Sequence, residues 1–300
     1  MNESIRLDQF YDAFIKNFTS VALGIIINYI NGTLVFTFLN HVDFYSDPRY
    51  ILYIHLVIND MLMLSLAVGT QVAGYISPYF KVSVCCMLLL LISTTTKNTP
   101  LNLAGMAIER YIAICKPLHH PQICTVRRTY ILIGFIWGIS LVPALSDIFI
   151  VMIAKPLNIF SRTILCHMSS IYNTMQHTMQ ATVVQVMYLS FVWVTLIFTY
   201  FKVLFVAKGA TTDQVSARKA RNTILLHAVQ LLLCMLSYFT PFINAILLPL
   251  FPNSRTNILF VFFLLLNILP RLLSPLIYGI RDKKIFKHIK VYLICRLQCA

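Results

Sequence analysis

Four ionisable residues lie inside stretches of sequence that otherwise carry no charge: Asp60, Lys97, Asp147 and Arg271. An ionisable group in an apolar segment is costly unless it is paired, so such residues usually face the interior of a helix bundle and serve a function. The chain has no His-Glu-x-x-His motif, and His119-His120 is too short a cluster for a zinc site. We therefore expect binding or switching chemistry, with no cofactor, no metal and no enzymatic activity.

The composition indicates a membrane protein. Of the 300 residues, 58% are hydrophobic and only 11% are charged, whereas soluble domains carry about 25% charged residues. The net charge of +14 would suit nucleic acid, but basic residues on an apolar chain collect in cytoplasmic loops, so we expect no nucleic-acid partner. Seven apolar stretches are long enough to cross a bilayer, and they predict an all-α seven-helix bundle in a single domain over 1–300: 21–39, 50–75, 84–108, 129–153, 181–201, 223–250 and 256–280.

The basic residues predict how this bundle is oriented. With the amino terminus outside, 16 Lys and Arg lie on the cytoplasmic side and 6 on the outer side, while Lys97 and Arg271 lie within spans. This bias predicts an outer amino terminus and a cytoplasmic carboxyl terminus, where 281–300 forms a short basic tail. The sequons at Asn2 and Asn17 agree with this orientation, because they would be glycosylation sites of an outer amino-terminal tail. The first residues lack the apolar run of a signal peptide, so we expect no signal peptide.

Five motifs occur in order at the places where helices are expected. They are Leu56-Val57-Ile58-Asn59-Asp60, Met106-Ala107-Ile108-Glu109-Arg110-Tyr111 with the following residues to His120, Trp137, Lys219-Ala220-Arg221-Asn222-Thr223 with His227, and Ser274-Pro275-Leu276-Ile277-Tyr278. Together they resemble the odorant receptors, within the rhodopsin-like G-protein-coupled receptors, over the whole chain. Pro48-Arg49-Tyr50 and Ser274-Pro275 look most like the fish-type members.

The resemblance implies a switch at the inner end of the third helix. Arg110 is always charged and would be held by Glu109 at rest, until outward movement of the sixth helix admits a G protein. The residues that it implies for this switch are Glu109, Arg110, Tyr111, Tyr200, Lys219, Thr223, His227 and Tyr278. Glu109 stands where the family commonly has Asp. The sixth helix lacks the Cys-Trp-x-Pro sequence of many related receptors, so the activation pivot cannot be transferred.

Asp60 and Arg271 are expected to pair within the bundle. Each lies about nine or ten residues from the inner end of its span, or roughly 15 Å, so the two opposite charges share one depth. With Asn31 and Ser274 nearby, this polar network would take the place of the sodium ion that many related receptors hold. Ser274 also replaces the family's usual Asn.

Lys97 admits two interpretations. Ser93, Thr96 and Lys97 share one helical face, which could line a ligand pocket together with Tyr188, Tyr238 and Asn267, and Lys97 would then bind an anionic group. Alternatively, Lys97 pairs internally with Asp147 or binds backbone carbonyls.

The resemblance also implies a disulfide between Cys85 and Cys166, with Cys86 as a rival partner. Cys295 and Cys299 follow a basic run, and such juxtamembrane cysteines are candidates for palmitoylation.

The expected function is that of an odorant receptor in the plasma membrane of olfactory sensory neurons, which binds a small molecule and activates a stimulatory olfactory-type G protein with a cyclic AMP response. The alternatives are a non-olfactory receptor for a peptide or lipid and, more remotely, a transporter or channel. A retinal protein is excluded because 256–280 contains no lysine, and an aminergic receptor because 84–108 contains no acidic residue.

Overall fold

The computed structural model describes residues 2–77, 79–166, 168–209, 232, 247, 249–251 and 254–275. Its long helices are α1 (Asn2–Leu39), α2 (Pro48–Ile76), α3 (Val82–Cys115), α5 (Val126–Ala154) and α7 (Met175–Gly209). The last described helix runs from α10 (Arg255–Phe263) through the π-helical turn η5 (Leu264–Ile268) into α11 (Leu269–Pro275). Among the described residues, six helices are long and apolar enough to cross a membrane. The expected sixth span, 223–250, falls almost wholly outside them.

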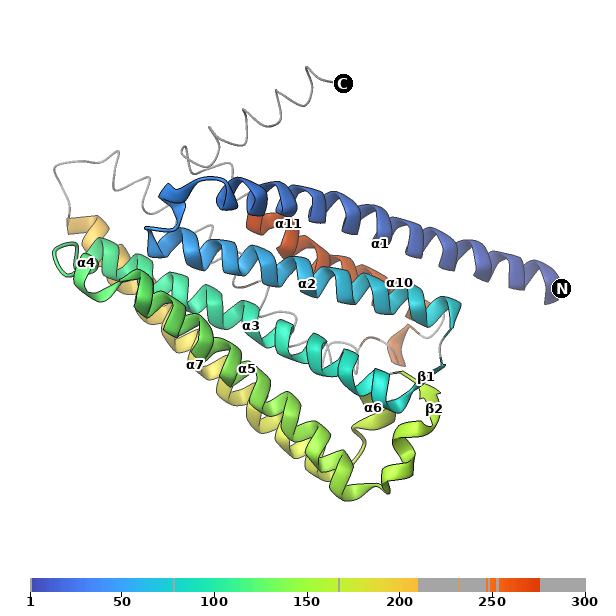
Figure 1. The fold of residues 1–300 in the computed structure, drawn as a ribbon. Coiled ribbons are helices and arrows are strands. Elements are labelled where there is room, and N and C mark those ends of the chain that lie inside the picture. The colour runs from blue at the N-terminus through green and yellow to red at the C-terminus, as the bar shows by residue number, and fades with distance from the viewer. Residues whose placement is uncertain are drawn as a thin grey trace, which may run out of the picture.

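Helix α3 lies at the centre of the described bundle. It packs against α2, α5 and α7, while α1 packs on α2 and both contact α11 (Figure 1). Because α3 faces neighbours on several sides, its middle turns bury polar residues that a lipid-facing helix could not carry: Thr94, Thr95, Asn98, Thr99 and Asn102. Helix α2 and α5 are further joined by a hydrogen bond of 2.8 Å from Trp137 Nε1 to His55 Nε2.

Short elements close the two ends of the bundle. At one end, 3-10 helix η1 (Val42–Phe44) links α1 to α2, and the short helix α4 (His120–Ile123) links α3 to α5. At the other end, near the amino terminus in Figure 1, β1 (Tyr79–Lys81) pairs antiparallel with β2 (Thr163–Leu165). The 3-10 helix η2 (Leu157–Ser161) and α6 (Met168–Ile171) complete this end.

Local sequence explains where two of the long helices begin. Pro48 occupies the first turn of α2, where its missing N–H costs nothing, and the Asp47 side chain accepts a hydrogen bond from the Arg49 backbone N–H at 3.0 Å. Thr125 caps α5 by accepting from the Arg128 backbone N–H at 3.4 Å. The first turns of α2 and α5 are thus specified by side chains that accept hydrogen bonds from otherwise free backbone N–H groups.

Helix α1 extends farther toward the amino terminus than the expected first span, 21–39. Helix α1 begins at Asn2, and its membrane-competent part begins at Phe10. The rings of Phe10, Phe14 and Phe18 stack at intervals of four residues along its surface, and this spacing is typical of neighbours on one helical face. The aromatic residues between polar ones therefore extend the helix well beyond the continuous apolar run.

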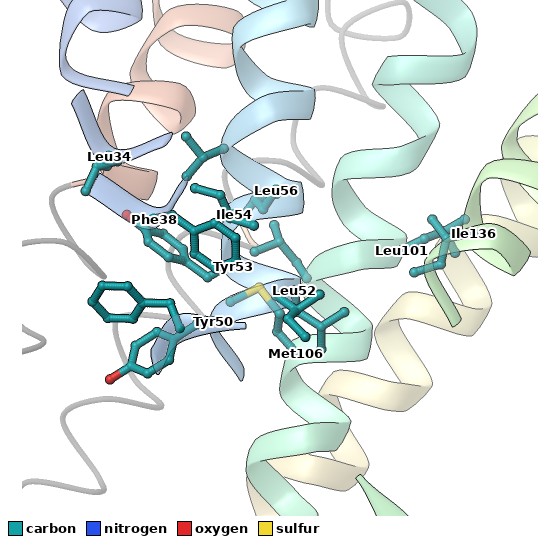
Figure 2. Close-up of a cluster of buried hydrophobic side chains, with 14 of the residues drawn as sticks. Leu34, Phe38, Tyr50, Leu52, Tyr53, Ile54, Leu56, Leu101, Met106 and Ile136 are labelled. Carbon is teal, nitrogen blue, oxygen red and sulfur yellow. The ribbon is translucent and has the colours of Figure 1, made fainter. Parts of the chain in front are cut away.

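The largest apolar core lies toward the end that holds η1. It joins side chains of α1, α2, α3 and α5, which Figure 2 shows converging on α2. The members drawn there include Leu34, Phe38, Tyr50, Leu56, Met106 and Ile136. This packing fixes the half of the bundle that carries Glu109 and Arg110.

Candidate functional site

The inner end of α3 holds an acidic side chain between two basic ones. Glu109 is only 7% exposed. Its Oε1 lies 3.0 Å from His120 Nε2 on α4, and its Oε2 lies 3.8 Å from Arg110 Nε. A buried carboxylate needs such partners because an unpaired charge is costly there.

His120 was not predicted as part of this site. The sequence contains it within the stretch that follows Glu109, and the separation of 11 residues could have suggested a partner. The contact depends on the tight turn after Lys116, where the backbone N–H groups of His119 and His120 both donate to the Lys116 carbonyl. Sequence spacing alone does not specify that turn.

Other expected switch residues are placed less completely. The rings of Tyr111 and Phe198 meet edge to face with centroids 5.5 Å apart, which joins α3 to α7. Tyr200 is half-buried on α7 and makes an edge contact with Phe201. The remaining four, Lys219, Thr223, His227 and Tyr278, lie outside the described residues.

Near the inner end of α3, burial raises the pKa of the Cys124 thiol, and the Glu109 carboxylate raises it further. The thiol therefore stays protonated at neutral pH.

The structure brings Asp60 and Arg271 together in the middle of the bundle. Asp60 Oδ1 lies 4.0 Å from Arg271 Nε, and the two residues are 1% and 4% exposed. Thr99 donates a hydrogen bond of 3.3 Å to Asp60 Oδ1, and Asn59 donates to Thr99 Oγ1 at 2.9 Å. Thr99, which was not predicted, thus links the charged pair to α3.

Arg271 also satisfies the backbone of its own helix. Its Nη1 donates to the carbonyls of Leu266 at 3.0 Å and Asn267 at 2.9 Å. Pro270 has no N–H to donate to the carbonyl four residues earlier, that of Leu266. The Arg271 guanidinium supplies the donor that Pro270 lacks, and the hydrogen bond to the Leu266 carbonyl holds the guanidinium in place. This bond explains how a cation is tolerated at this depth.

The other two members of the expected polar network are less connected. Asn31 is fully buried on α1, and neither atom of its amide has a hydrogen-bond partner among the described residues. Ser274 belongs to α11, but its side chain is not among those described.

Lys97 is held inside the bundle. Its Nζ donates to Ser93 Oγ one turn earlier on α3, and Asp147 of α5 interacts with it electrostatically. Thr96 donates its hydroxyl to the Ile92 carbonyl of its own helix. The structure thus contains the internal partner that the sequence offered as an alternative, while Lys97 and Ser93 still share a face.

Tyr188, which we expect to line the ligand pocket, is anchored to α5. Its hydroxyl donates to the Ile139 carbonyl on α5 at 2.6 Å, and this carbonyl lacks its usual helical partner because residue 143 is proline. Of the remaining pocket candidates, Asn267 lies half-buried in η5, and Tyr238 falls outside the described residues.

The opposite end carries the expected disulfide. Cys85 and Cys166 are joined, with Cα atoms 5.6 Å apart, while the rival Cys86 is free and buried. His177 fixes the same loop, because its Nε2 lies 3.0 Å from the Asp147 carbonyl and its ring stacks on Tyr172 at 5.1 Å. Burial raises the pKa of the Tyr172 phenol, so this ring remains neutral.

The expected modification sites are placed as follows. Asn17 is within α1, where its Nδ2 donates to the Ala13 carbonyl at 3.0 Å and its Oδ1 accepts from Gln71 at 3.3 Å. Glycosylation uses that same amide nitrogen, so the hydrogen bonds of Asn17 favour Asn2 as the residue to be modified, and both sites stay predictions. Asn2 begins α1, and Cys295 and Cys299 lie outside the described residues.

Comparison with known proteins identifies the family. Residues 30–278 match the family described as 7 transmembrane receptor (rhodopsin family). The chain belongs to the rhodopsin family of seven-transmembrane receptors. The expected fold class, an all-α seven-helix membrane bundle, is therefore confirmed, and the family is one of receptors rather than enzymes.

This rhodopsin-family receptor resembles odorant receptors in particular. It is 30% identical to Odorant receptor 131-2 of Danio rerio over 281 residues, which cover 93% of this chain and 86% of that receptor. It is also 30% identical to Olfactory receptor 4K5 of Homo sapiens over 148 residues, or 48% of this chain and 44% of that receptor. A shorter match, 28% identical over 107 residues, is to Nematocin receptor 2 of Caenorhabditis elegans and covers 35% of this chain and 27% of that receptor.

These similarities confirm the expected resemblance to odorant receptors of the fish type. The receptor is a multi-pass membrane protein, and membership of the family implies a small-molecule ligand and a G protein as partners.

Proposed function

We propose that this receptor detects a small odorant within its helix bundle and activates a stimulatory olfactory-type G protein, which raises cyclic AMP in olfactory sensory neurons. The similarity to an odorant receptor over 93% of the chain carries the proposal. The whole of 1–300 acts as one domain, with 281–300 as a basic cytoplasmic tail.

Two features support the amino terminus as the outer one. In the sequence, most of the Lys and Arg residues fall in segments expected on the same side as Arg110, and the positive-inside rule makes that side the cytoplasmic one. The disulfide between Cys85 and Cys166 lies at the opposite end of α3, and disulfides persist on the oxidising side of a membrane.

The inner end of α3 serves as the switch in this proposal. At rest, Glu109 accepts from His120 while it pairs with Arg110. Ligand binding favours a second arrangement of the bundle in which the sixth helix moves outward and Arg110 faces the G protein. A ligand shifts such an equilibrium only by its difference in affinity for the two states.

Lys97 provides the ligand site with a positive charge. Ser93 and Lys97 lie one turn apart, and the Asp147 carboxylate is the charge that opposes the ammonium group. An odorant with a carboxylate could take over part of this neutralisation, because charge-assisted hydrogen bonds are the stronger ones. Carboxylates are therefore the ligands to screen first.

The experiment is to express the receptor with an olfactory-type G protein and to measure cyclic AMP against a panel of soluble odorants that includes matched carboxylates, esters and alcohols. We expect responses that Arg110→Ala abolishes at unchanged surface expression. Lys97→Met should weaken responses to carboxylates selectively, whereas Lys81→Met at the outer end should not. A full panel without any response would contradict the odorant proposal, and an unchanged profile for Lys97→Met would remove Lys97 from recognition.

A further inference from the structure

A cavity lies away from the centre of the bundle, at the inner end of α3. Its volume is about 430 Å³, within the range of roughly 300–1,000 Å³ typical of sites for small molecules. Residues of α3, α4 and α7 line it: Ile108, Tyr111, Ile112, Lys116, Ile123, Val194, Thr195, Phe198 and Thr199.

The wall of this cavity is almost entirely apolar. Thr199, one of its few polar residues, donates its hydroxyl to the Thr195 carbonyl of its own helix at 2.7 Å, so that group is already satisfied. Ile108, Val194 and Phe198 are exposed on the surface of the described residues, and they belong to helices that are long and apolar enough to cross a membrane. The cavity therefore offers apolar surface to the surrounding hydrocarbon.

Two lysines stand where the cavity meets the inner end of the bundle. Lys116 lines it at the end of α3 and is itself exposed, and the Lys202 ammonium group lies 5.9 Å from the centre of the Phe198 ring. Within the described ranges, neither ammonium group forms an ion pair with a carboxylate. Lys202 follows Phe198 by one helical turn, so its ammonium group lies beside the apolar wall on the same face of α7, while Lys116 belongs to the lining itself.

We propose that this cavity binds an anionic phospholipid of the inner leaflet, with an acyl chain against Ile112 and Phe198 and the phosphate between Lys116 and Lys202. Anionic lipids are concentrated in the cytoplasmic leaflet and are attracted to basic residues at its surface. The occupant is a lipid because the lysines match its headgroup and the apolar wall matches its chain. Neither a soluble anion nor a neutral lipid matches both parts.

The bound lipid would act on coupling through Tyr111. This residue lines the cavity, contacts Phe198 across the two helices and directly follows Arg110 in the sequence. A lipid that holds α3, α4 and α7 together would therefore bias the switch at the inner end. The inference does not depend on the identity of the odorant or on an odorant being the ligand.

The test measures lipid binding to the purified full-length receptor without any odorant. The receptor is reconstituted in phosphatidylcholine nanodiscs that contain a small fraction of phosphatidylserine, and the retained phosphatidylserine is titrated by native mass spectrometry. We expect a saturable site for which Lys116→Gln and Lys202→Gln each weaken binding by about fivefold. Thr195→Phe and Val194→Phe, which keep both charges and narrow the cavity, should also reduce binding.

The matched control is Arg127→Gln, which removes one exposed charge from the same side of the bundle outside the cavity and should leave the titration unchanged. Soluble glycerophosphoserine, which has the headgroup without its chains, should not compete. Equal retention of phosphatidylcholine and phosphatidylserine would overturn the proposal. Equal losses for Arg127→Gln and Lys116→Gln would overturn it as well, because the effect would then be one of general surface charge. Both outcomes would leave the odorant proposal standing.

Discussion

At the scale of single residues, His120 is the most informative addition to the inner site. It binds Glu109 at 3.0 Å from a different segment of the chain, so it can hold α4 against α3. A hydrogen bond to a charged group contributes about 1.5–3 kcal/mol, enough to change the balance between two receptor states about tenfold or more.

We predict that His120→Phe raises ligand-independent cyclic AMP by several-fold, because Glu109 then loses its strongest partner and holds Arg110 and α4 less firmly. The measurement is the basal signal normalised to surface receptor. The neighbouring His119 is exposed, so His119→Phe is the matched control and should leave the basal signal unchanged. Equal basal signals for both variants would contradict the role of His120.

The pair of Asp60 and Arg271 leads to a second residue-scale prediction. Removal of one partner leaves an uncompensated buried charge, which typically costs about 3–5 kcal/mol. Arg271→Met should therefore lower the melting temperature of the purified receptor strongly, and Asp60→Asn should lower it as well. The double variant should lose less than the sum, because residues in direct contact are not additive. Strictly additive losses would show that the two side chains do not interact.

The depths of these two residues were predictable from sequence, whereas the details of their surroundings were not. Counting residues along two helices placed both charges at one level, because helical rise is constant. The hydrogen bond from Thr99 to Asp60 and the role of Arg271 beside Pro270 depend on rotations of whole helices. Sequence periodicity does not determine such rotations for segments that are apolar on every side.

At the scale of elements, proline and tyrosine act together to join α5 to α7. Pro143 removes the N–H that would bind the Ile139 carbonyl, and Tyr188 supplies a hydroxyl in its place at 2.6 Å. A carbonyl within a membrane-spanning helix finds no water to bind, so leaving it without a donor costs about 1–3 kcal/mol. The contact therefore stabilises a helix that its own backbone leaves incomplete.

We predict that Tyr188→Phe lowers the melting temperature in the natural sequence, because the Ile139 carbonyl loses its donor. In a Pro143→Ala background the backbone N–H returns, so the same change should have much less effect. Surface expression and thermal unfolding of the four variants give a double-mutant cycle. Equal losses in both backgrounds would mean that Tyr188 stabilises the receptor by packing alone.

The positions of the helices could be predicted more easily than their ends. Long apolar runs located all six described spans, because length and hydropathy decide whether a segment crosses a bilayer. The start of α1 at Asn2 and the short helix α4 were missed, because both are set by side-chain stacking and turn geometry rather than by hydropathy. The motif at the inner end of α3 therefore identified Glu109 and Arg110, but it did not identify His120 of α4 as their neighbour.

At the scale of the whole molecule, charge and redox chemistry divide the receptor along α3. The cysteines of the disulfide lie at one end, and Glu109 and Arg110 lie near the other. The net charge of +14 thus serves mainly to orient the chain, and the basic residues that depart from this pattern are Lys97 and Arg271. Both depart because they have partners inside the bundle.

The orientation and the packing of α1 can be tested together. An epitope tag at the amino terminus should be accessible to antibody on intact cells, and a tag at the carboxyl terminus only after permeabilisation. If a glycan is attached, Asn2→Gln should remove it and Asn17→Gln should not, because the Asn17 amide is bonded to Ala13 and Gln71 within the packed helices. The measurement is the glycosidase-sensitive shift in electrophoretic mobility. A shift lost only in Asn17→Gln would mean that α1 unwinds before this residue in the cell, and a carboxyl-terminal tag exposed on intact cells would reverse the orientation.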